Sequence, residues 1–373
     1  MDSAINVSLR IFVILLFVPW TWNHYLPLHV AGSILSLLIA LLSLSYAATE
    51  NWTPDNGRSD KQQNGTRISR TTLYRTRALG LLAGLYILSV AIFLPSTNPL
   101  DHVRIRVLAF FNAAKILDLA VARASSPPMR VENQKPILIK GFQGRLEYIW
   151  LLAAETRYHS FDIAIYEPGR GKPAERIWTI WPALLVPALI WLFPRRVEFH
   201  ILLSVLIIQI GGETMHSILH PSCKHPLFYQ PLAASSIRSF WRTHWHSAAA
   251  SFFYTLGYQP ARNLVSKVFG RSAGKAAGVL GAFCVSGIWH AWASAALVTT
   301  PWRTGAGVLG LFMGQAIACI VESVLPNKKR GVVLGLAIWW FALWTASLWI
   351  KDSLPRSNLP FIVEISKILA SGN

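Results

Sequence analysis

The chain has 373 residues, of which 53% are hydrophobic and only 14% are charged, and its formal net charge is +18. A soluble domain is typically about 25% charged, so this composition excludes an ordinary soluble protein and favours one that crosses a membrane several times. Basic residues in such a protein usually mark cytosolic loops, so we expect no nucleic-acid partner. The three cysteines lie far apart and predict neither a disulfide framework nor a CxxC metal site.

Apolar runs predict an all-α, polytopic transmembrane bundle of about 8–10 membrane helices, each needing roughly 20 apolar residues. It forms a single membrane-embedded domain over residues 1–373. In chain order the expected spans are 11–22, 26–48, 78–94, 107–122, 177–193, 197–219, 276–296, 304–321 and 331–350. The first follows Arg10 without a small-residue cleavage site, which predicts a retained signal anchor.

Two segments between or within these spans are polar. Residues 49–77 are rich in Asn, Gly and Ser and predict a flexible loop. The span 107–122 carries Lys115 and Asp118, which share one helix face. That face either lines the interior of the bundle or places the helix on the membrane surface.

The distribution of charge predicts an orientation. If the spans alternate from a cytosolic N-terminus, roughly three-quarters of the Lys and Arg residues fall on the cytosolic side. We therefore expect an integral membrane protein of the endoplasmic reticulum with its basic loops in the cytosol. The acceptor sequons at Asn6, Asn51 and Asn64 would then not be glycosylated.

Residues 220–275 are expected to form a cytosolic loop, with seven Lys or Arg and no Asp or Glu. Such a loop either faces anionic lipid or attracts a polyanionic cosubstrate such as coenzyme A, with Arg238, Arg242 and His244 against its phosphates. Aromatic residues predict that part of the segment lies at the membrane interface. These residues are Phe228, Tyr229, Phe240, Trp241 and Trp245.

His290 is the single ionisable residue in the apolar run 276–296. If Lys275 marks the cytosolic end of this helix, fifteen residues place His290 about 22 Å deep, past the middle of a hydrocarbon core about 30 Å thick. An ionisable residue at that depth is by default a functional-site hypothesis. It is either a general base, kept neutral by the low dielectric, or a structural histidine bonded across helices.

A second set of histidines is compatible with metal binding. His216 and His220 are spaced i, i+4, and His225, His244 and His246 follow. Imidazole suits the irons of membrane di-iron oxygenases, but the chain has no adjacent histidine pair and no HExxH motif. We expect no metal site, and a histidine-box oxidase or hydroxylase is kept as an alternative.

The chain contains two motifs. The first is PLFYQP (226–231) followed by SSIRSFW (235–241) and Trp245-His246, and the second is SGIWH (286–290) on an apolar helix. Both resemble motifs of the wax-synthase-like branch of the membrane-bound O-acyltransferases. Their order and spacing resemble the family from about residue 226 to residue 292.

The resemblance implies roles for individual residues. His290 would be the catalytic base, and His246 would hold the acyl carbonyl or the base by a hydrogen bond. The cosubstrate would be bound by Arg238, Trp241, Arg242, His244 and Trp245. The family commonly has Gly-Arg-Arg between the two tryptophans, whereas this chain has Arg-Thr-His. The CoA contacts, and whether His244 or His246 is the inner partner of His290, therefore stay open.

The resemblance also implies the reaction. It is similar to that of fungal terpenoid and meroterpenoid O-acetyltransferases, which move an acetyl group from acetyl-CoA to a hydroxyl of a hydrophobic alcohol in secondary-metabolite biosynthesis. Residues 220–300 would form the catalytic core, without a tightly bound cofactor. A long-chain wax or sterol ester synthase is a second interpretation. A transporter is a third, although we find no internal repeats or paired broken helices. The oligomeric state is left open.

Overall fold

The computed structural model describes most of the N-terminal half of the chain and a block around the two motifs. The described residues are 26–50, 68–93, 99–132, 135–155, 157–164, 209–210, 212–213, 216, 227–228, 234, 236–245, 248–295 and 301–324. These residues are almost entirely helical, apart from one short antiparallel pair, β1 (Val131–Glu132) and β2 (Lys135–Pro136). The predicted all-α class is confirmed.

Four of the described helices are long and apolar enough to cross a membrane: His29–Glu50, Arg70–Phe93, Ala250–Ser294 and Thr304–Val324. They confirm a polytopic membrane protein. The predicted spans 11–22, 177–193 and 331–350, and nearly all of 197–219, lie outside the described residues. The predicted number of spans therefore stays a prediction, as does the expected cytosolic position of the three sequons.

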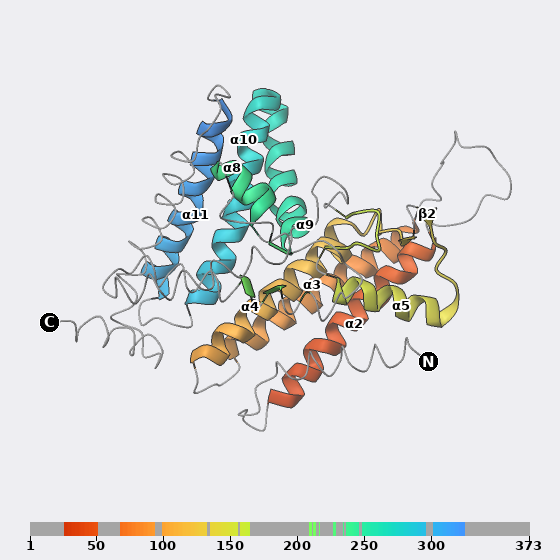
Figure 1. Cartoon of the computed structure of the whole chain (residues 1–373). Helices are drawn as coiled ribbons and strands as arrows, with labels where there is room; N and C mark the ends of the chain where they lie inside the picture. The colour runs from red at the N-terminus through yellow and green to blue at the C-terminus, as the bar shows by residue number, and fades with distance from the viewer. Residues whose placement is uncertain are drawn as a thin grey trace.

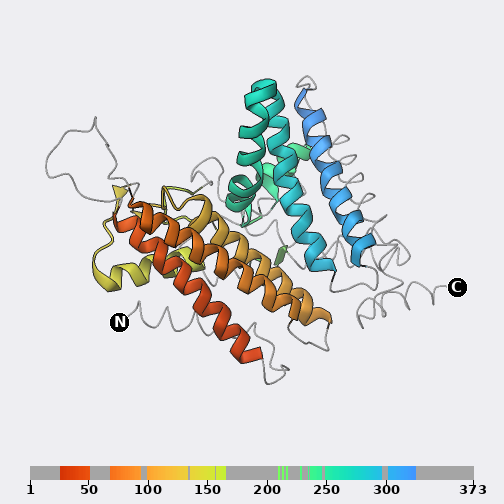
Figure 2. The same ribbon diagram turned by 180° about the vertical axis from the view of Figure 1, so that it is seen from behind.

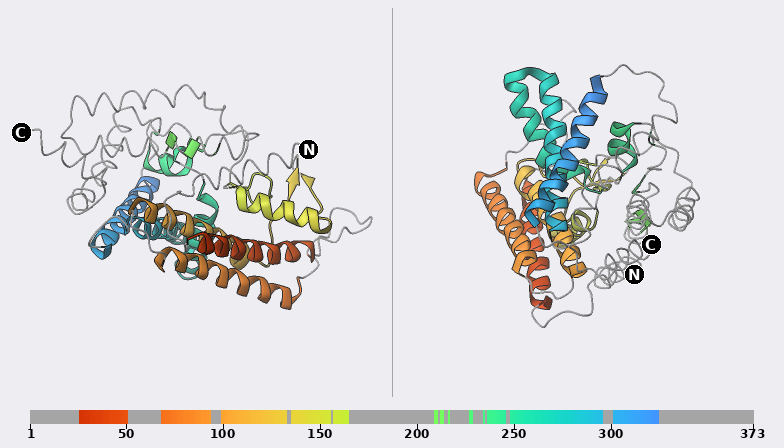
Figure 3. Two further views of the ribbon diagram at one scale, coloured as in Figure 1. Left: turned by 90° about the horizontal axis from the view of Figure 1, so that it is seen from below. Right: turned by 90° about the vertical axis from the view of Figure 1, so that its left-hand side faces the viewer.

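An N-terminal group of helices forms one side of the molecule (Figures 1 and 2). It contains α2 (Leu26–Glu50), α3 (Arg70–Phe93), α4 (Pro99–Ile116) and α5 (Gly141–Ala154), and α4 continues as a π-helix, η1 (Leu117–Ala122). Helices α2, α3 and α4 pack together, and α5 lies against α2 (Figure 3). Their shared core is built largely from small side chains, which let membrane helices approach closely. It consists of Ala40, Ala83, Ile87, Ala91, Ala109, Ile116 and Ala120.

The structure corrects one expectation in this group and decides between two alternatives for another feature. Helix α3 begins at Arg70, so the last part of the predicted loop 49–77 is helical. Lys115 and Asp118 are both buried, so their helix face lies inside the bundle and not on a membrane surface. Local hydropathy does not decide between the two alternatives for Lys115 and Asp118, because the packing partners of these residues come from other segments.

A helical hairpin forms much of the C-terminal part. One arm contains α9 (Ala250–Phe252), the π-helix η5 (Phe253–Tyr258) and the start of α10 (Gln259–Ser294), and the other arm is the rest of α10. The two arms meet at Gly270, whose φ of 82° lies in the left-handed region that favours glycine. Figures 1 and 2 show them side by side above the N-terminal group.

Glycines allow the two arms to pack closely. A Cβ on Gly257 would lie 2.5 Å from the carbonyl oxygen of Gly281, so only glycine fits there. Helix α11 (Pro301–Val324) packs on the other side of α10, where a Cβ on Gly287 would lie 2.8 Å from Leu309 Cδ1. Such small-residue contacts are typical of membrane helix interfaces.

The hairpin corrects the expectation that residues 220–275 form a loop. From Ala250 to the hairpin turn this segment is helical and packed against α10. Arg262 and Lys267 interrupt the apolar run and hide the helix from a search for uniformly hydrophobic spans. The stabilising glycine contacts join residues more than twenty positions apart and therefore leave no local signal.

Candidate functional site

Residues 236–245, the main described part of the first motif, form a short helical segment beside α11. It contains α8 (Ile237–Ser239) and a π-helical turn, η4 (Phe240–His244). Ser236 begins the turn: its hydroxyl accepts a hydrogen bond from the Ser239 amide, and the Ser239 hydroxyl accepts one from the Ser236 amide. This reciprocal cap satisfies two amides that a helix start otherwise leaves unpaired. Ser236 and Ser239 therefore have a structural role.

Trp241 of this turn contacts both long helices. Its indole nitrogen donates to Gln315 Oε1 on α11 at 3.3 Å, and Gln315 is buried. Its ring packs edge-on against Phe283 of α10 at 5.4 Å and lies 5.9 Å from the ring of Phe312 on α11. The motif is thus anchored at the seam between α10 and α11.

His290 lies on the same seam. Its ring centroid is 4.4 Å from that of Phe312. Phe312 therefore contacts both Trp241 of the first motif and His290 of the second, although the two motif residues are 49 positions apart. Phe312 thus connects the described parts of the two motifs.

The tautomer of His290 follows from its hydrogen bond. Nδ1 lies 2.8 Å from the carbonyl oxygen of Ser286, one turn earlier on α10. A carbonyl oxygen only accepts hydrogen bonds, so Nδ1 carries the proton and donates. In a neutral imidazole Nε2 then has the lone pair and is the nitrogen able to accept a proton.

The neighbouring Trp289 fixes the rotation of α10 at this level. Its buried ring contacts Phe110 and Phe111 of α4 at 6.0 and 6.3 Å. It also contacts Phe252 and Phe253 of the other hairpin arm at 6.0 and 5.8 Å. Successive helix residues point about 100° apart, so a clamped Trp289 directs His290 to the α11 side.

The other predicted cosubstrate residues lie along the same turn. Arg238 and Arg242 are exposed, and the backbone amide of Arg238 donates to Glu322 of α11 at 2.8 Å. His244 is half-buried. Trp245 ends the turn, with its ring 5.3 Å from Phe240 and 5.2 Å from Phe228. His246 lies outside the described residues, so its predicted role as partner of His290 stays a prediction.

The proposed histidine box finds no support in the part of the chain that is described. His216 is buried and its Nε2 lies 2.5 Å from an Arg157 guanidinium nitrogen, so its neighbour there is a cation and not a metal ligand. Among the described residues no group of three His, Cys, Asp or Glu side chains is placed to hold a metal ion. His220 and His225 lie outside those residues.

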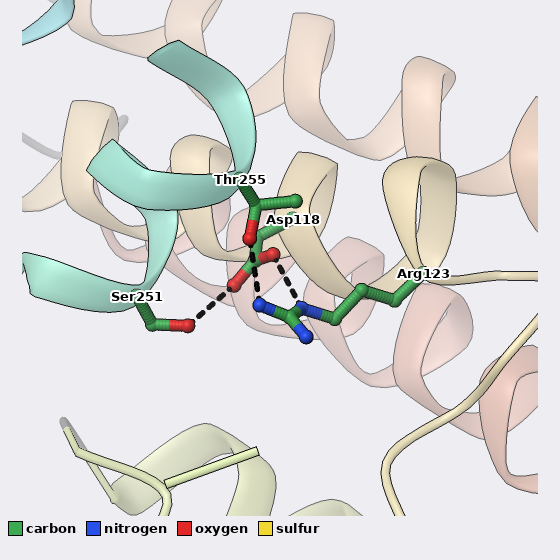
Figure 4. A network of polar contacts seen from close by, with 4 residues as sticks. All are labelled: Asp118, Arg123, Ser251 and Thr255. Atoms are coloured by element: carbon green, nitrogen blue, oxygen red, sulfur yellow. Dashed lines mark hydrogen bonds and ion pairs between the residues drawn. The ribbon is translucent and has the colours of Figure 1, made fainter. Parts of the chain in front are cut away.

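A buried network connects the hairpin to the N-terminal group (Figure 4). Asp118 of η1 accepts from Arg123 Nε at 2.8 Å and from the Ser251 hydroxyl at 3.0 Å. Arg123 also donates to the Thr255 hydroxyl at 2.6 Å. We call these four residues the polar joint. Ser251 is next to Phe252, whose ring packs on Trp289 of α10. The polar joint therefore attaches to the N-terminal group the hairpin arm that packs against Trp289.

Sequence analysis missed several residues of this arrangement. Phe312 is one phenylalanine in an apolar span, and nothing in its local pattern distinguishes it. Gln315 had a usable signal, because an uncharged polar residue inside an expected span needs a hydrogen-bond partner. Asp118 is a polar residue on an expected helix, but its partner Ser251 is 133 positions away, and Thr255, the partner of Arg123, is 132 positions from that arginine.

Comparison with known proteins connects this geometry to a family. The comparison with curated proteins gave no match. Residues 224–313 match the family model described as the membrane bound O-acyl transferase family. The matched region covers about a quarter of the chain and includes Trp241, His290 and Phe312, the three rings that join the motifs. The match supports a membrane-bound O-acyltransferase.

Proposed function

We propose that the protein transfers an acyl group, specifically acetyl, from acyl-CoA to a hydroxyl of a hydrophobic terpenoid or meroterpenoid alcohol, with His290 as general base. One observation carries this proposal. The Nδ1 of His290 is committed to the Ser286 carbonyl, which leaves Nε2 as the basic nitrogen at a seam where the two family motifs meet. A base needs such a defined tautomer to accept a proton.

The proposed reaction is a direct transfer. Nε2 of His290 accepts the proton of the acceptor hydroxyl while that oxygen attacks the thioester carbonyl carbon. A tetrahedral intermediate forms and collapses, the carbon–sulfur bond breaks, and the CoA sulfur leaves with the proton from the imidazolium. The products are an ester and free CoA. No covalent enzyme intermediate is needed.

The contacts that Arg238 and Trp241 make with α11 support a path for acyl-CoA. The Arg238 backbone contacts Glu322, whereas Trp241 contacts Gln315 and Phe312. Ten helical residues separate Glu322 from Phe312, a rise of about 15 Å along α11. Exposed Arg238 and Arg242 suit the phosphates of CoA, and the thioester would extend along the motif toward His290.

His246 keeps its proposed role of hydrogen-bonding the acyl carbonyl, which would stabilise the developing oxyanion. A hydrophobic acceptor suits an enzyme with several membrane helices, because such an alcohol partitions into lipid while CoA approaches from water. The endoplasmic reticulum, with the basic segments cytosolic, is the proposed location.

The test uses isolated membranes supplied with labelled acetyl-CoA and a panel of terpenoid alcohols. We expect the wild type to form a labelled ester. His290→Ala should lower the rate by about 100- to 10,000-fold, the usual contribution of a general base. His290→Gln is the closer control for packing, because it retains a hydrogen-bond donor but is not basic at neutral pH.

The possible outcomes test separately the role of His290, the identity of the acyl donor and the class of enzyme. A folded His290→Ala protein that matches the wild type would make His290 structural. Ester formed from palmitoyl-CoA and not from acetyl-CoA would assign a long-chain ester synthase. No transfer from either donor, together with stoichiometric iron in the purified wild type, would favour the oxidase alternative and overturn the acyltransferase.

A further inference from the structure

The turn of the helical hairpin has a surface that the proposed reaction does not use. We call residues 262–275, which surround Gly270, the hairpin tip. It lies at the end of α10 opposite His290, twenty residues or about 30 Å away. Figures 1 and 2 show this end projecting away from the N-terminal helices.

Large apolar side chains are exposed on the tip. Leu264, Val268 and Phe269 are 70%, 72% and 73% exposed. Leu264 and Val268 are spaced i, i+4 and share one face of the first arm. Phe269 directly precedes the turn, so all three residues lie within six positions of Gly270 at the end of the hairpin.

Basic side chains accompany them. Lys267, Arg271 and Lys275 are exposed and Arg262 is half-exposed, and the sequence 220–275 contains no Asp or Glu. The lipid-facing side of α2 differs: Ile34, Leu35, Leu38 and Ile39 are exposed there, but no Lys, Arg, Asp or Glu occurs between Leu26 and Thr49. A purely apolar face suits hydrocarbon, whereas a mixture of apolar and cationic groups suits the headgroup layer.

We infer that the hairpin tip binds anionic phospholipid headgroups of the cytosolic leaflet. Leu264, Val268 and Phe269 would enter the boundary between headgroups and acyl chains, and the cations around them would pair with lipid phosphate and carboxylate. Basic residues near an anionic membrane surface each contribute about 1 kcal/mol, and buried apolar area adds to this.

The fold divides the basic segment between two ligands. Arg238 and Arg242 lie on the motif turn beside α11, the proposed CoA path. Arg262, Lys267, Arg271 and Lys275 lie on the hairpin arms around Gly270. For residues 220–275 the sequence left two alternatives, anionic lipid or coenzyme A. In the structure the basic residues suited to each ligand lie on different elements. The lipid inference does not depend on the acyltransferase activity.

The test measures lipid binding to the purified full-length protein. Native mass spectrometry from detergent micelles counts bound phosphatidylserine and chain-matched phosphatidylcholine over a titration. We expect the wild type to bind phosphatidylserine more tightly. About 1 kcal/mol per cation corresponds to about fivefold, so Lys267→Gln/Arg271→Gln/Lys275→Gln should weaken phosphatidylserine binding about a hundredfold.

The matched control removes the same charge elsewhere. Arg70→Gln/Arg75→Gln/Lys135→Gln neutralises three exposed residues away from the tip and should retain the preference for phosphatidylserine. Val268→Ser/Phe269→Ser keeps the charge and should weaken binding of both lipids. Thermal unfolding in phosphatidylcholine alone checks that every variant is folded.

Three results would overturn the inference. The first is equal phosphatidylserine binding by the wild type and the folded tip variant. The second is an equal loss of binding in the control triple variant. The third is displacement of phosphatidylserine from the wild type by equimolar CoA, which would make the tip a nucleotide site.

Discussion

The N-terminal helices and the C-terminal helices bury polar groups of different kinds. In the N-terminal group the buried side chains include Lys115, Asp118 and Glu155. Lys115 donates to two backbone carbonyls, Asp118 pairs with Arg123, and the Glu155 carboxylate accepts from the amide and hydroxyl of Ser160. Among the described residues 236–324, the buried polar side chains are neutral, such as Ser286, Thr304 and Gln315. Within the described parts of the chain, the buried Lys, Arg, Asp and Glu side chains therefore all belong to residues 115–157.

The difference has a physical reason. A buried ion pair resists separation because each partner left alone is a costly buried charge, which makes it suitable for joining elements. Proton transfer to a general base instead needs a neutral imidazole, and a fixed charge nearby would bias its protonation. The aromatic rings around His290 supply contact area without charge. We therefore expect the N-terminal network to control stability and the α10–α11 seam to control activity.

The largest expected effect concerns the seam. His290→Ala should reduce acyl transfer by about 100- to 10,000-fold, because it removes the base. Its free energy of unfolding in mixed micelles should change by less than about 2 kcal/mol, the scale of one lost hydrogen bond and some packing. A large loss of stability with activity per folded molecule intact would reverse the comparison.

The corresponding change in the polar joint is Asp118→Asn. Removing one partner of a buried pair costs about 3–5 kcal/mol, and we expect the low end because the Arg123 side chain is 21% exposed and can reach water. Unfolding in mixed micelles measures the loss. Glu147→Gln is the control: its pair with Arg130 has the same 2.7–2.8 Å geometry, but Glu147 is 52% exposed, so about 0–1 kcal/mol is expected. Equal effects would mean that burial does not distinguish the two pairs.

The contact between α10 and α11 is tested with glycine substitutions. Gly287→Val places carbon atoms against Leu309 and Phe312 and should cost about 1–3 kcal/mol by overpacking. Because Phe312 contacts His290, activity should fall as well. Gly310→Val makes the same change on α11, where a Cβ would meet nothing within 4 Å, and should affect neither property beyond helix propensity. Activity unchanged in Gly287→Val would show that the seam tolerates a shift of α11.

The smallest effect concerns the indole nitrogens of two tryptophans. Trp241→Phe removes the hydrogen bond to buried Gln315, so we expect a loss of about 0.5–1.5 kcal/mol beyond the lost ring area. Trp289→Phe removes an indole nitrogen that has no hydrogen-bond partner among the described residues, so only the ring area counts there. Unfolding of both variants gives the difference. If both variants lost the same free energy of unfolding, the Trp241–Gln315 hydrogen bond would make no net contribution to stability.

Some of this arrangement follows from local sequence. Apolar runs identify α2, α3, α10 and α11 because about 20 consecutive apolar residues are what a bilayer crossing requires. His290 stands out for the same reason: it is the only ionisable side chain in its run. Ser236 and Ser239 form a capping box that depends on residues three positions apart.

Other features have no local signal. The first arm of the hairpin carries Arg262 and Lys267 and is helical because Gly257 lets it approach Gly281. The depth expected for His290 was measured from Lys275, whereas the structure shows the helix continuing to a turn at Gly270. Packing between distant residues decides these points, and sequence spacing does not encode it.

The sequence by itself therefore determined the class of protein, the four described membrane-length helices in outline, the two motifs and His290, because each depends on composition or on residues a few positions apart. Only the tertiary structure decided that Phe312 joins Trp241 to His290, that Asp118 holds the hairpin through Ser251, and that residues 250–269 are helical. These features arise from contacts between side chains on different helices, and such contacts exist only once the helices have packed.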